Sequence, residues 1–440
     1  MSMSMRIIGL CDCDNFFVSC ERRCDPSLNS RPVVVLSGND GCVISRSKEV
    51  KDMGIPMGAP YFKVRRQLEQ AGAAVLSGRL SMYGEISAQV MERISRFTDL
   101  MEVYSIDEAF FNLSIASVAD TEEYCRRLRA DIMRCCGVPV SVGISCTKTL
   151  AKLASKCAKK SAAGVFRLRP EHYLDPEWMG RVSASDIWGV GRRTAERLRI
   201  YHRILSAYDL ASADDLLLKK NFSVHTLYTA WELRGCPVYL ISDKISPPRS
   251  IQVSRSFGED VCSYEELLEA LSCFVLRAAC QLRRAGRAAS RMEIWIMTSR
   301  FKKDNFYARS AEREFHEPCS VDSDFLYAAR DMLSSIYRHG FAYKKAGVLL
   351  SELSDTACGI QMRLFDENRE NTAGVPYDKL YAAAGVTDAI NSRAGRTLIA
   401  PADNFAPGGR RRWHSLHEHG SAFSPVVSEA AEIPKRRIHF

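Results

Sequence analysis

The most informative absences in this sequence concern its cysteines and its hydrophobic runs. None of the 16 cysteines forms a C-x-x-C pair, so their spacing gives no support for a zinc site. Residues 1–6 lack the apolar stretch of a signal peptide, and no apolar run has the length that crosses a bilayer. Many cysteines lie inside apolar segments, where cysteine behaves as a small buried hydrophobe. The sequence therefore predicts a cytoplasmic protein of a reducing compartment, without a membrane partner.

What the sequence has in excess is positive charge. The formal net charge is +9, from 61 lysines and arginines against 52 acidic residues. A polyanion is therefore a plausible partner, although a basic surface without any partner would give the same balance. A length of 440 residues with 46% hydrophobic content suits two to four domains with cores of their own.

Three carboxylates follow apolar segments that alternate as strands do. Asp107 and Glu108 interrupt an apolar and aromatic run, and Asp12 ends a second apolar run near the N-terminus. If the two strands lie side by side, the three carboxylates converge, and such a group can hold two Mg²⁺ ions about 3.5–4 Å apart. The alternative is that these acids only keep a sheet edge soluble.

A row of lysines suggests contact with phosphate groups. Lys148, Lys152 and Lys156 recur every four residues in a segment with helical periodicity, so they share one face of the expected helix. No acid of the segment compensates them, which favours phosphate contact. A simple solvated helix face remains the alternative.

A glycine pair predicts a second contact with phosphate. Gly189 and Gly191 flank one valine directly before Arg192, where a helix is expected to begin. Backbone N–H groups at such a turn point outward and form an anion site at the start of the helix. The segment is typical of the hairpin of a helix-hairpin-helix motif, which holds a DNA phosphate without reading base sequence.

The second half of the chain begins after a stiff linker that contains Pro247 and Pro248. A compact α+β unit is expected beyond it, with a basic cluster that includes Arg283 and suits a phosphate backbone. Regular structure is expected to thin out after about residue 354. There, Gln361, Leu364 and Phe365 form a short exposed motif that either docks in a groove of another protein or folds back on its own domain.

Four stretches together resemble the Y-family of translesion DNA polymerases, and within it the UmuC type. The resemblance covers residues 6–365 and is carried by Asp12-Cys13-Asp14-Asn15-Phe16-Phe17, Asn39-Asp40-Gly41-Cys42-Val43-Ile44, Tyr104-Ser105-Ile106-Asp107-Glu108-Ala109-Phe110, and Val142-Gly143-Ile144-Ser145 with the lysines after it.

The resemblance implies an α+β multidomain fold shaped as a right hand. Its expected parts are a palm (6–28 and 78–165), fingers (29–77), a helical thumb with the helix-hairpin-helix (166–240), a linker (241–250), an α+β little finger (251–355), and a flexible C-terminal tail with a clamp-binding peptide (356–440).

The resemblance also implies roles for individual residues. Asp12, Asp107 and Glu108 match the catalytic carboxylates, which with the carbonyl of Cys13 would hold two Mg²⁺ ions. The expected nucleotide-binding residues are Phe16, Phe17, Ser45, Lys51 and Lys159, with Phe17 as the steric gate that excludes a 2′-OH. The expected DNA-binding residues are Lys152, Lys156, Gly189, Gly191 and Arg192. The expected clamp-binding residues are Gln361, Leu364 and Phe365.

The implied function is error-prone, template-directed DNA synthesis across damaged templates, in DNA repair and SOS mutagenesis. The expected partners are primer-template DNA, deoxynucleoside triphosphates and a sliding clamp, with a UmuD-prime dimer and a recombinase filament as further candidates. The end of the chain, after about residue 407, departs from the typical UmuC pattern. Two alternatives stay open: a catalytically inactive DNA-binding scaffold of the same fold, and a two-metal nuclease or cyclase.

Overall fold

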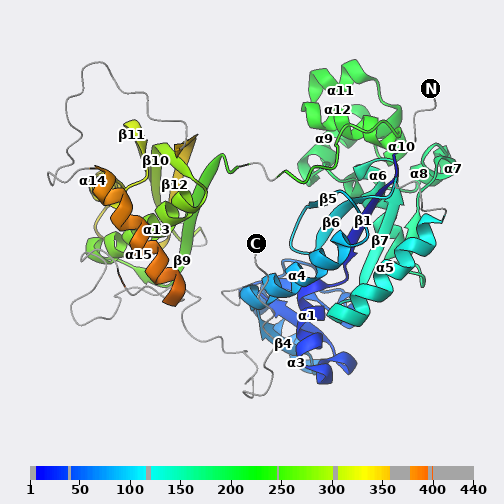
Figure 1. The fold of residues 1–440 in the computed structure, drawn as a ribbon, viewed down its shortest axis with the longest axis horizontal. Helices are drawn as coiled ribbons and strands as arrows, with labels where there is room; N and C mark the ends of the chain where they lie inside the picture. Colours follow the sequence, from blue (N-terminus) through cyan, green and yellow to red (C-terminus); the bar gives the residue numbers. More distant parts are fainter. Residues whose placement is uncertain are drawn as a thin grey trace. The chain divides into compact units, whose positions relative to one another are not determined.

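The computed structural model describes residues 6–37, 41–114, 120–244, 247–300, 306–356, 377–394 and 399. The described residues divide into two compact units, one that contains residues 6–244 and one that contains those from residue 247 onward. Each unit has its own hydrophobic core. The two units are described separately below and are drawn in Figure 1.

The first unit is organised on a five-stranded sheet in the order β5-β6-β1-β7-β8. Strand β1 lies in the middle, antiparallel to both β6 and β7, while β7 and β8 are parallel. The strands are β1 (Ile8–Cys13), β5 (Met101–Val103), β6 (Glu108–Asn112), β7 (Val140–Ser145) and β8 (Val165–Arg167). The sequence expectation that the segments of Asp12 and Glu108 are neighbouring strands is met by this sheet.

Helices cover both faces of this sheet, because successive side chains of a strand point to opposite faces. In β1, Cys11 and Cys13 belong to the main core, whereas Ile8 and Leu10 pack with Ala151 on the other face. The main core also takes side chains of the three helices α1 (Phe16–Cys24), α4 (Leu80–Ser95) and α5 (Thr121–Cys136). Helix α6 (Lys148–Ala158) lies against β7 and β1 and supplies Ala151.

Helix α6 approaches β7 as closely as two backbones can. A β-carbon added to Gly143 of β7 would lie 2.1 Å from the amide nitrogen of Ser155 and 2.3 Å from the carbonyl oxygen of Ala151. Only glycine fits at this position, because the atoms it would meet belong to the helix backbone and not to a flexible side chain.

A smaller sheet of three strands, in the order β3-β2-β4, forms a module within the same unit. The segment from residue 26 to residue 77 contains η1 (Pro26–Ser30), β2 (Val33–Leu36), β3 (Val43–Arg46), α2 (Lys48–Asp52), α3 (Tyr61–Gln70) and β4 (Ala74–Ser77). Strand β4 is parallel to β2. The small core of this module includes Val34 and Leu36 of β2 and Leu68 of α3.

The rest of the first unit is helical, as its sequence predicts. Its elements are α7 (Pro170–Tyr173), α8 (Pro176–Gly180), η2 (Ala184–Asp186), α9 (Arg192–His202), α10 (Ala207–Ser212), α11 (Asp215–Asn221) and α12 (Val224–Leu233). Buried leucines of these helices share a core with Leu150 and Leu153 of α6, so the helical part is packed on the sheet part.

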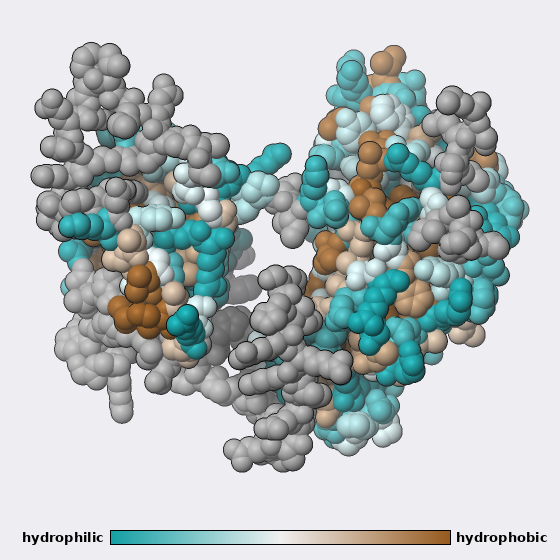
Figure 2. All heavy atoms as spheres, in the orientation of Figure 1, coloured by the Kyte–Doolittle hydropathy of each residue, from teal (hydrophilic) through white to brown (hydrophobic). Residues whose placement is uncertain are grey.

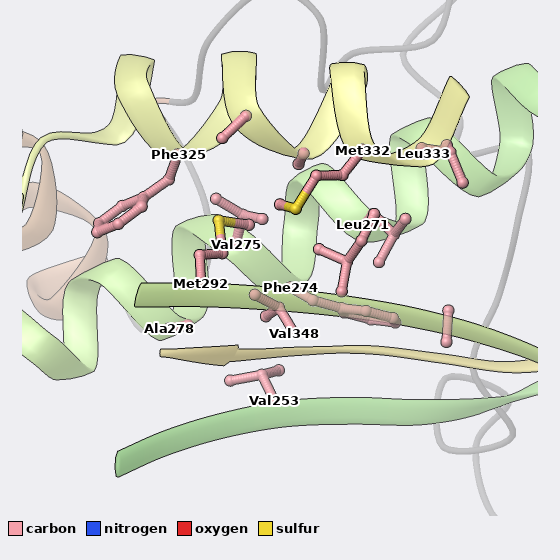
Figure 3. Packing of buried hydrophobic residues seen from close by; sticks show 14 of the residues in the cluster. Val253, Leu271, Phe274, Val275, Ala278, Met292, Phe325, Met332, Leu333 and Val348 are labelled. Carbon is pink, nitrogen blue, oxygen red and sulfur yellow. The ribbon is translucent and has the colours of Figure 1, made fainter. Parts of the chain in front are cut away.

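The second unit is an antiparallel sheet in the order β11-β10-β12-β9, with two long helices on one face. Its elements are β9 (Ser250–Val261), α13 (Tyr264–Arg284), β10 (Arg287–Thr298), β11 (Ala308–Cys319), α14 (Asp322–Ile336) and β12 (Tyr343–Asp355). Figure 3 shows Leu271 and Phe274 of α13 and Met332 of α14 above the sheet residues Val253 and Val348.

A further helix, α15 (Tyr377–Ala394), corrects the expectation of a uniformly flexible tail. Leu380 packs against the core of the second unit, and Asp388 forms an ion pair with Arg283 at 2.8 Å. Arg283 also pairs with Asp322 and its side chain is only 6% exposed. Arg283 is thus held by two carboxylates, and the prediction that it belongs to a phosphate-binding surface is wrong.

Figure 2 shows apolar residues on the surface of α15, where Val386 and Ile390 are exposed.

Within the described ranges, no helix combines the length and the hydropathy that crossing a bilayer requires.

Candidate active site

Two of the predicted carboxylates, Asp12 and Glu108, face each other across the central strand pair, and Asp107 precedes Glu108 in the chain. Asp12 on β1 lies directly opposite Glu108 on β6, and the amide of Cys13 donates a hydrogen bond of 2.9 Å to the carbonyl of Asp107. Leu10 and Phe110 lie on the sheet face that α6 covers, and residues two positions away along each strand share that face. Asp12 and Glu108 therefore point to the same face, toward the helix that carries the lysine row.

Each carboxylate has its own hydrogen-bond partner. Asp12 accepts a hydrogen bond of 2.7 Å from Lys159, and Glu108 accepts one of 2.9 Å from Lys152. Asp107 accepts one of 2.6 Å from the hydroxyl of Ser105. Two ammonium groups thus supply the positive charge that such a cluster of acids requires.

This arrangement bears on metal binding. Among the residues that the structure describes, no three His, Cys, Asp or Glu side chains are grouped so that they could hold a metal ion as they stand. The donor atoms are carboxylate oxygens, which suit a hard cation such as Mg²⁺. The residues fit such a cation, provided that it replaces the two ammonium groups as the partner of Asp12 and Glu108.

Burial makes Asp12 an unusual acid. Its side chain lies at the end of a strand with only 8% of the residue exposed. Burial raises the pKa of Asp12 to about 7; Lys159 opposes this rise, and the negative charges of Glu108 and Asp107 add to it. A cation within bonding distance strongly stabilises the charged form of such a buried carboxylate.

The lysine row is not a uniformly solvated face, because each of its three lysines pairs with an acid. Lys148 is buried and forms an ion pair of 2.6 Å with Glu102. Lys152 is mostly buried, with its Nζ atom 4.2 Å from the ring centre of Tyr104 and 5.5 Å from that of Trp188. Lys156 is about half exposed and pairs with Asp186. The acids that compensate the row come from distant parts of the sequence.

The predicted nucleotide-binding residues lie around the start of α1. Phe16 is buried in the main core, so only its backbone faces the site, whereas the side chain of Phe17 is partly exposed. The hydroxyl of Ser45 lies 3.4 Å from the carbonyl oxygen of Asn15, and the ammonium of Lys51 hydrogen-bonds to the Asn15 side chain. Asn15 has a left-handed backbone (φ 48°) that places both of its oxygens toward the small sheet.

Gly189 and Gly191 form the turn that the sequence predicts before α9. Gly189 has φ +87°, a conformation that favours glycine, and Gly191 is the N-cap residue of α9, with Arg192 as the first helical residue. The preceding Trp188 donates a hydrogen bond of 3.0 Å from its ring nitrogen to the hydroxyl of Tyr104.

Some functional residues were not found from the sequence, and one group lies outside the structure. Tyr104, Trp188 and Asn15 contact predicted site residues, yet neither their type nor their spacing marks them. Asn15 could have been found as a residue that tolerates the left-handed conformation between Asp14 and Phe16. The predicted clamp-binding residues Gln361, Leu364 and Phe365 lie outside the described residues.

The fold is that of the Y-family DNA polymerases. A Y-family DNA polymerase chimera superposes with a TM-score of 0.63 over 79% of this chain and 99% of that one, at 20% sequence identity. The insertion ternary complex of the Dbh DNA polymerase gives a TM-score of 0.53 over 79% of this chain and 99% of that one, at 21% identity.

Sequence comparison gives the family itself. The model of the impB/mucB/samB family matches residues 11–156, and the model of its C-terminal domain matches residues 248–364. Protein UmuC of Salmonella typhimurium is 34% identical over 397 residues, covering 89% of this chain and 92% of that protein. Protein SamB of Salmonella typhimurium is 34% identical over 438 residues, covering 98% and 100%. DNA polymerase IV of Caulobacter vibrioides is 27% identical, covering 87% and 93%.

The chain therefore belongs to the impB/mucB/samB family of Y-family DNA polymerases. It is a DNA-directed DNA polymerase of the error-prone class that acts in translesion synthesis, DNA repair and SOS mutagenesis. As a polymerase of this family it binds DNA and deoxynucleoside triphosphates and depends on a metal cofactor.

Proposed function

We propose that Asp12, Asp107 and Glu108, with the backbone carbonyl of Cys13, hold two Mg²⁺ ions at which the primer end is extended. The observation that carries this proposal is the placement of Asp12 opposite Glu108 on adjacent strands, each paired with a lysine. Bound Mg²⁺ would supply activation of the primer 3′-OH and charge neutralisation at the phosphates. The rigid sheet keeps the acids in place, so that little reorganisation is needed when substrate arrives.

The residues around Asn15 are proposed to hold the incoming nucleotide. Lys51 and Lys159 carry ammonium groups close to the carboxylates and suit a triphosphate. Ser45 is tied to Asn15 and fixes the small sheet against the start of α1. The partly exposed ring of Phe17 is proposed to lie against the sugar as the steric gate, where it excludes a 2′-OH.

We propose that DNA is held at three places within the chain. The turn of Gly189, Gly191 and Arg192 offers backbone N–H groups to a phosphate. Lys156 is exposed enough to reach another phosphate, and Lys152 acts closer to the carboxylates. In family terms, residues 6–28 and 78–165 would be the palm, 29–77 the fingers, 166–240 the thumb, 241–250 a linker and 251–355 the little finger.

Further partners are proposed from the resemblance alone. The motif of Gln361, Leu364 and Phe365 would bind a sliding clamp, with a UmuD-prime dimer and a recombinase filament as further partners. A pull-down of the clamp with the Leu364→Ala, Phe365→Ala double variant tests the first of these. Equal capture of clamp by wild type and variant would remove the clamp proposal.

The metal proposal is tested by primer extension on an intact template. We expect extension to require Mg²⁺, to stop with EDTA, and to fall about a hundredfold or more in Asp107→Asn, the loss typical of removing one electrostatic contact to the transition state. Asp99→Asn is the matched control, because Asp99 is exposed and bonds to Asn112 at the far end of β6. Equal extension by Asp107→Asn and wild type would overturn the proposal.

A further inference from the structure

A stacked pair of rings supports the proposed steric gate from behind. The ring centres of Phe17 on α1 and Tyr83 on α4 are 4.6 Å apart, with 20° between the ring planes. Tyr83 is fully buried, whereas Phe17 is partly exposed. One face of the Phe17 ring therefore rests on a ring that belongs to the core, and the orientation of Tyr83 limits how far Phe17 can tilt.

Tyr83 is itself held by a buried carboxylate. Its hydroxyl donates a hydrogen bond of 2.6 Å to Oε1 of Glu21, a residue of α1 that is 1% exposed. Glu21 also accepts a hydrogen bond of 3.0 Å from Nε of Arg79, and a second nitrogen of Arg79 binds its other oxygen. A buried carboxylate is costly unless it is paired in this way. Neither the metal site nor the phosphate contacts use this group.

Phe17 and Glu21 of α1 both contact Tyr83 of α4. Phe17 and Glu21 are four residues apart on α1, so they lie on the same face one turn from each other. Phe17 contacts the ring of Tyr83 and Glu21 binds its hydroxyl, so α1 holds the tyrosine at both ends. Arg79 precedes α4 by one residue and fixes the start of that helix to the same carboxylate. Glu21 thus binds the ring on which Phe17 stacks.

We propose that Glu21, with Arg79, is a positioning residue that sets the discrimination between deoxyribonucleotides and ribonucleotides. It acts by holding Tyr83, which in turn keeps the Phe17 ring at the depth where a 2′-OH collides with it. This inference rests on the proposed role of Phe17 as the gate. Exclusion of a single hydroxyl depends on a ring position accurate to a fraction of an ångström, because repulsion falls steeply with distance.

The experiment measures kcat/KM for insertion of one deoxyribonucleotide and of the matching ribonucleotide, and compares their ratio. Tyr83→Phe removes only the hydroxyl that Glu21 holds, and Glu21→Gln removes the charge. We expect each variant to lower the ratio about tenfold through faster ribonucleotide insertion, while deoxyribonucleotide insertion stays within about threefold of wild type. If Glu21→Gln does not fold, Tyr83→Phe alone carries the test.

The matched control is Tyr124→Phe. The hydroxyl of Tyr124 on α5 donates a hydrogen bond of 2.9 Å to the carbonyl of Phe97. The control variant therefore also loses one tyrosine hydrogen bond, at a place away from Phe17. Its ratio should equal that of wild type. Equal losses of both insertion rates in Tyr83→Phe, or an unchanged ratio, would overturn the inference.

Phe17→Ala separates this inference from the proposed gate. If Phe17→Ala admits ribonucleotides and Tyr83→Phe does not, the gate stands and the role of Glu21 is refuted. If Phe17→Ala leaves the ratio unchanged, the gate itself is refuted, and the inference fails with it.

Discussion

The Nζ atom of Lys159 lies 2.7 Å from Oδ1 of Asp12. Lys159 is the first residue beyond α6, and Asp12 is the last residue but one of β1, so the pair joins the helix to the middle strand of the sheet. We expect a bound cation to take over Asp12, which leaves the ammonium of Lys159 available to the triphosphate. Lys159 would then pair with Asp12 before substrate binds and with the phosphates of the nucleotide afterward.

Replacing Lys159 should therefore weaken nucleotide binding. A hydrogen bond between charged groups contributes about 1.5–3 kcal/mol, so Lys159→Met should raise KM for the deoxyribonucleotide about 10-fold to 100-fold. Steady-state insertion of a single nucleotide measures this change. Lys160→Met is the control, because Lys160 is the exposed neighbouring lysine and should leave KM near the wild-type value. A normal KM in Lys159→Met would contradict its phosphate role.

The two glycines of the α9 turn should respond differently to alanine. At Gly189 the backbone has φ +87° and a β-carbon would lie 2.9 Å from Oγ1 of Thr229, so Gly189→Ala should cost about 1–3 kcal/mol of stability. At Gly191, φ is −75° and no atom lies within 4 Å of an added β-carbon. Gly191→Ala should keep the wild-type Tm and still weaken binding of primer-template DNA.

Thermal melting and fluorescence anisotropy with labelled DNA separate these two effects. The informative variant is Gly191→Ala, since its fold is expected to be intact. If it binds DNA as tightly as wild type, the turn does not hold a phosphate, whatever Gly189→Ala does.

Helix α15 should depend on one buried ion pair. Arg283 is 6% exposed and bonds both carboxylate oxygens of Asp388, so Asp388→Ala should cost about 1–3 kcal/mol and release the helix first. Hydrogen exchange of peptides from residues 377–394 should become faster, with α13 and the sheet unchanged. Lys379→Ala, an exposed position on the same helix, is the control. Unchanged exchange in Asp388→Ala would show that Leu380 and its neighbours hold α15 without the ion pair.

Strong local patterns predicted much of the fold from sequence. The start of α9 is one example, because the glycine pair predicted it: Gly191 is the N-cap residue and Arg192 is the first residue of the helix. The strands of Asp12 and Glu108 are equally clear: acids follow the apolar run of β1, and Glu108 begins the apolar run of β6. These two runs were enough to predict that the strands of Asp12 and Glu108 are neighbours.

Elements without a local pattern were missed. Strand β11 lies at the edge of its sheet and is mostly exposed, so its sequence shows no regular alternation of apolar residues. Helix α15 is fixed by contacts of Leu380 with the core of the second unit and of Asp388 with Arg283 of α13, which no local window contains. For the same reason the partners of the lysine row were not foreseen, since Lys148 and Lys152 lie 46 and 44 residues from their acids.

The contact between Gly143 and α6 restricts how this enzyme can be changed by selection. Because the backbones of β7 and α6 are in direct contact, a substitution at residue 143 cannot change the distance between them in small steps. Variants with altered fidelity should therefore carry their substitutions around this pair, in the small sheet or in the helices near Trp188, and leave residue 143 as glycine.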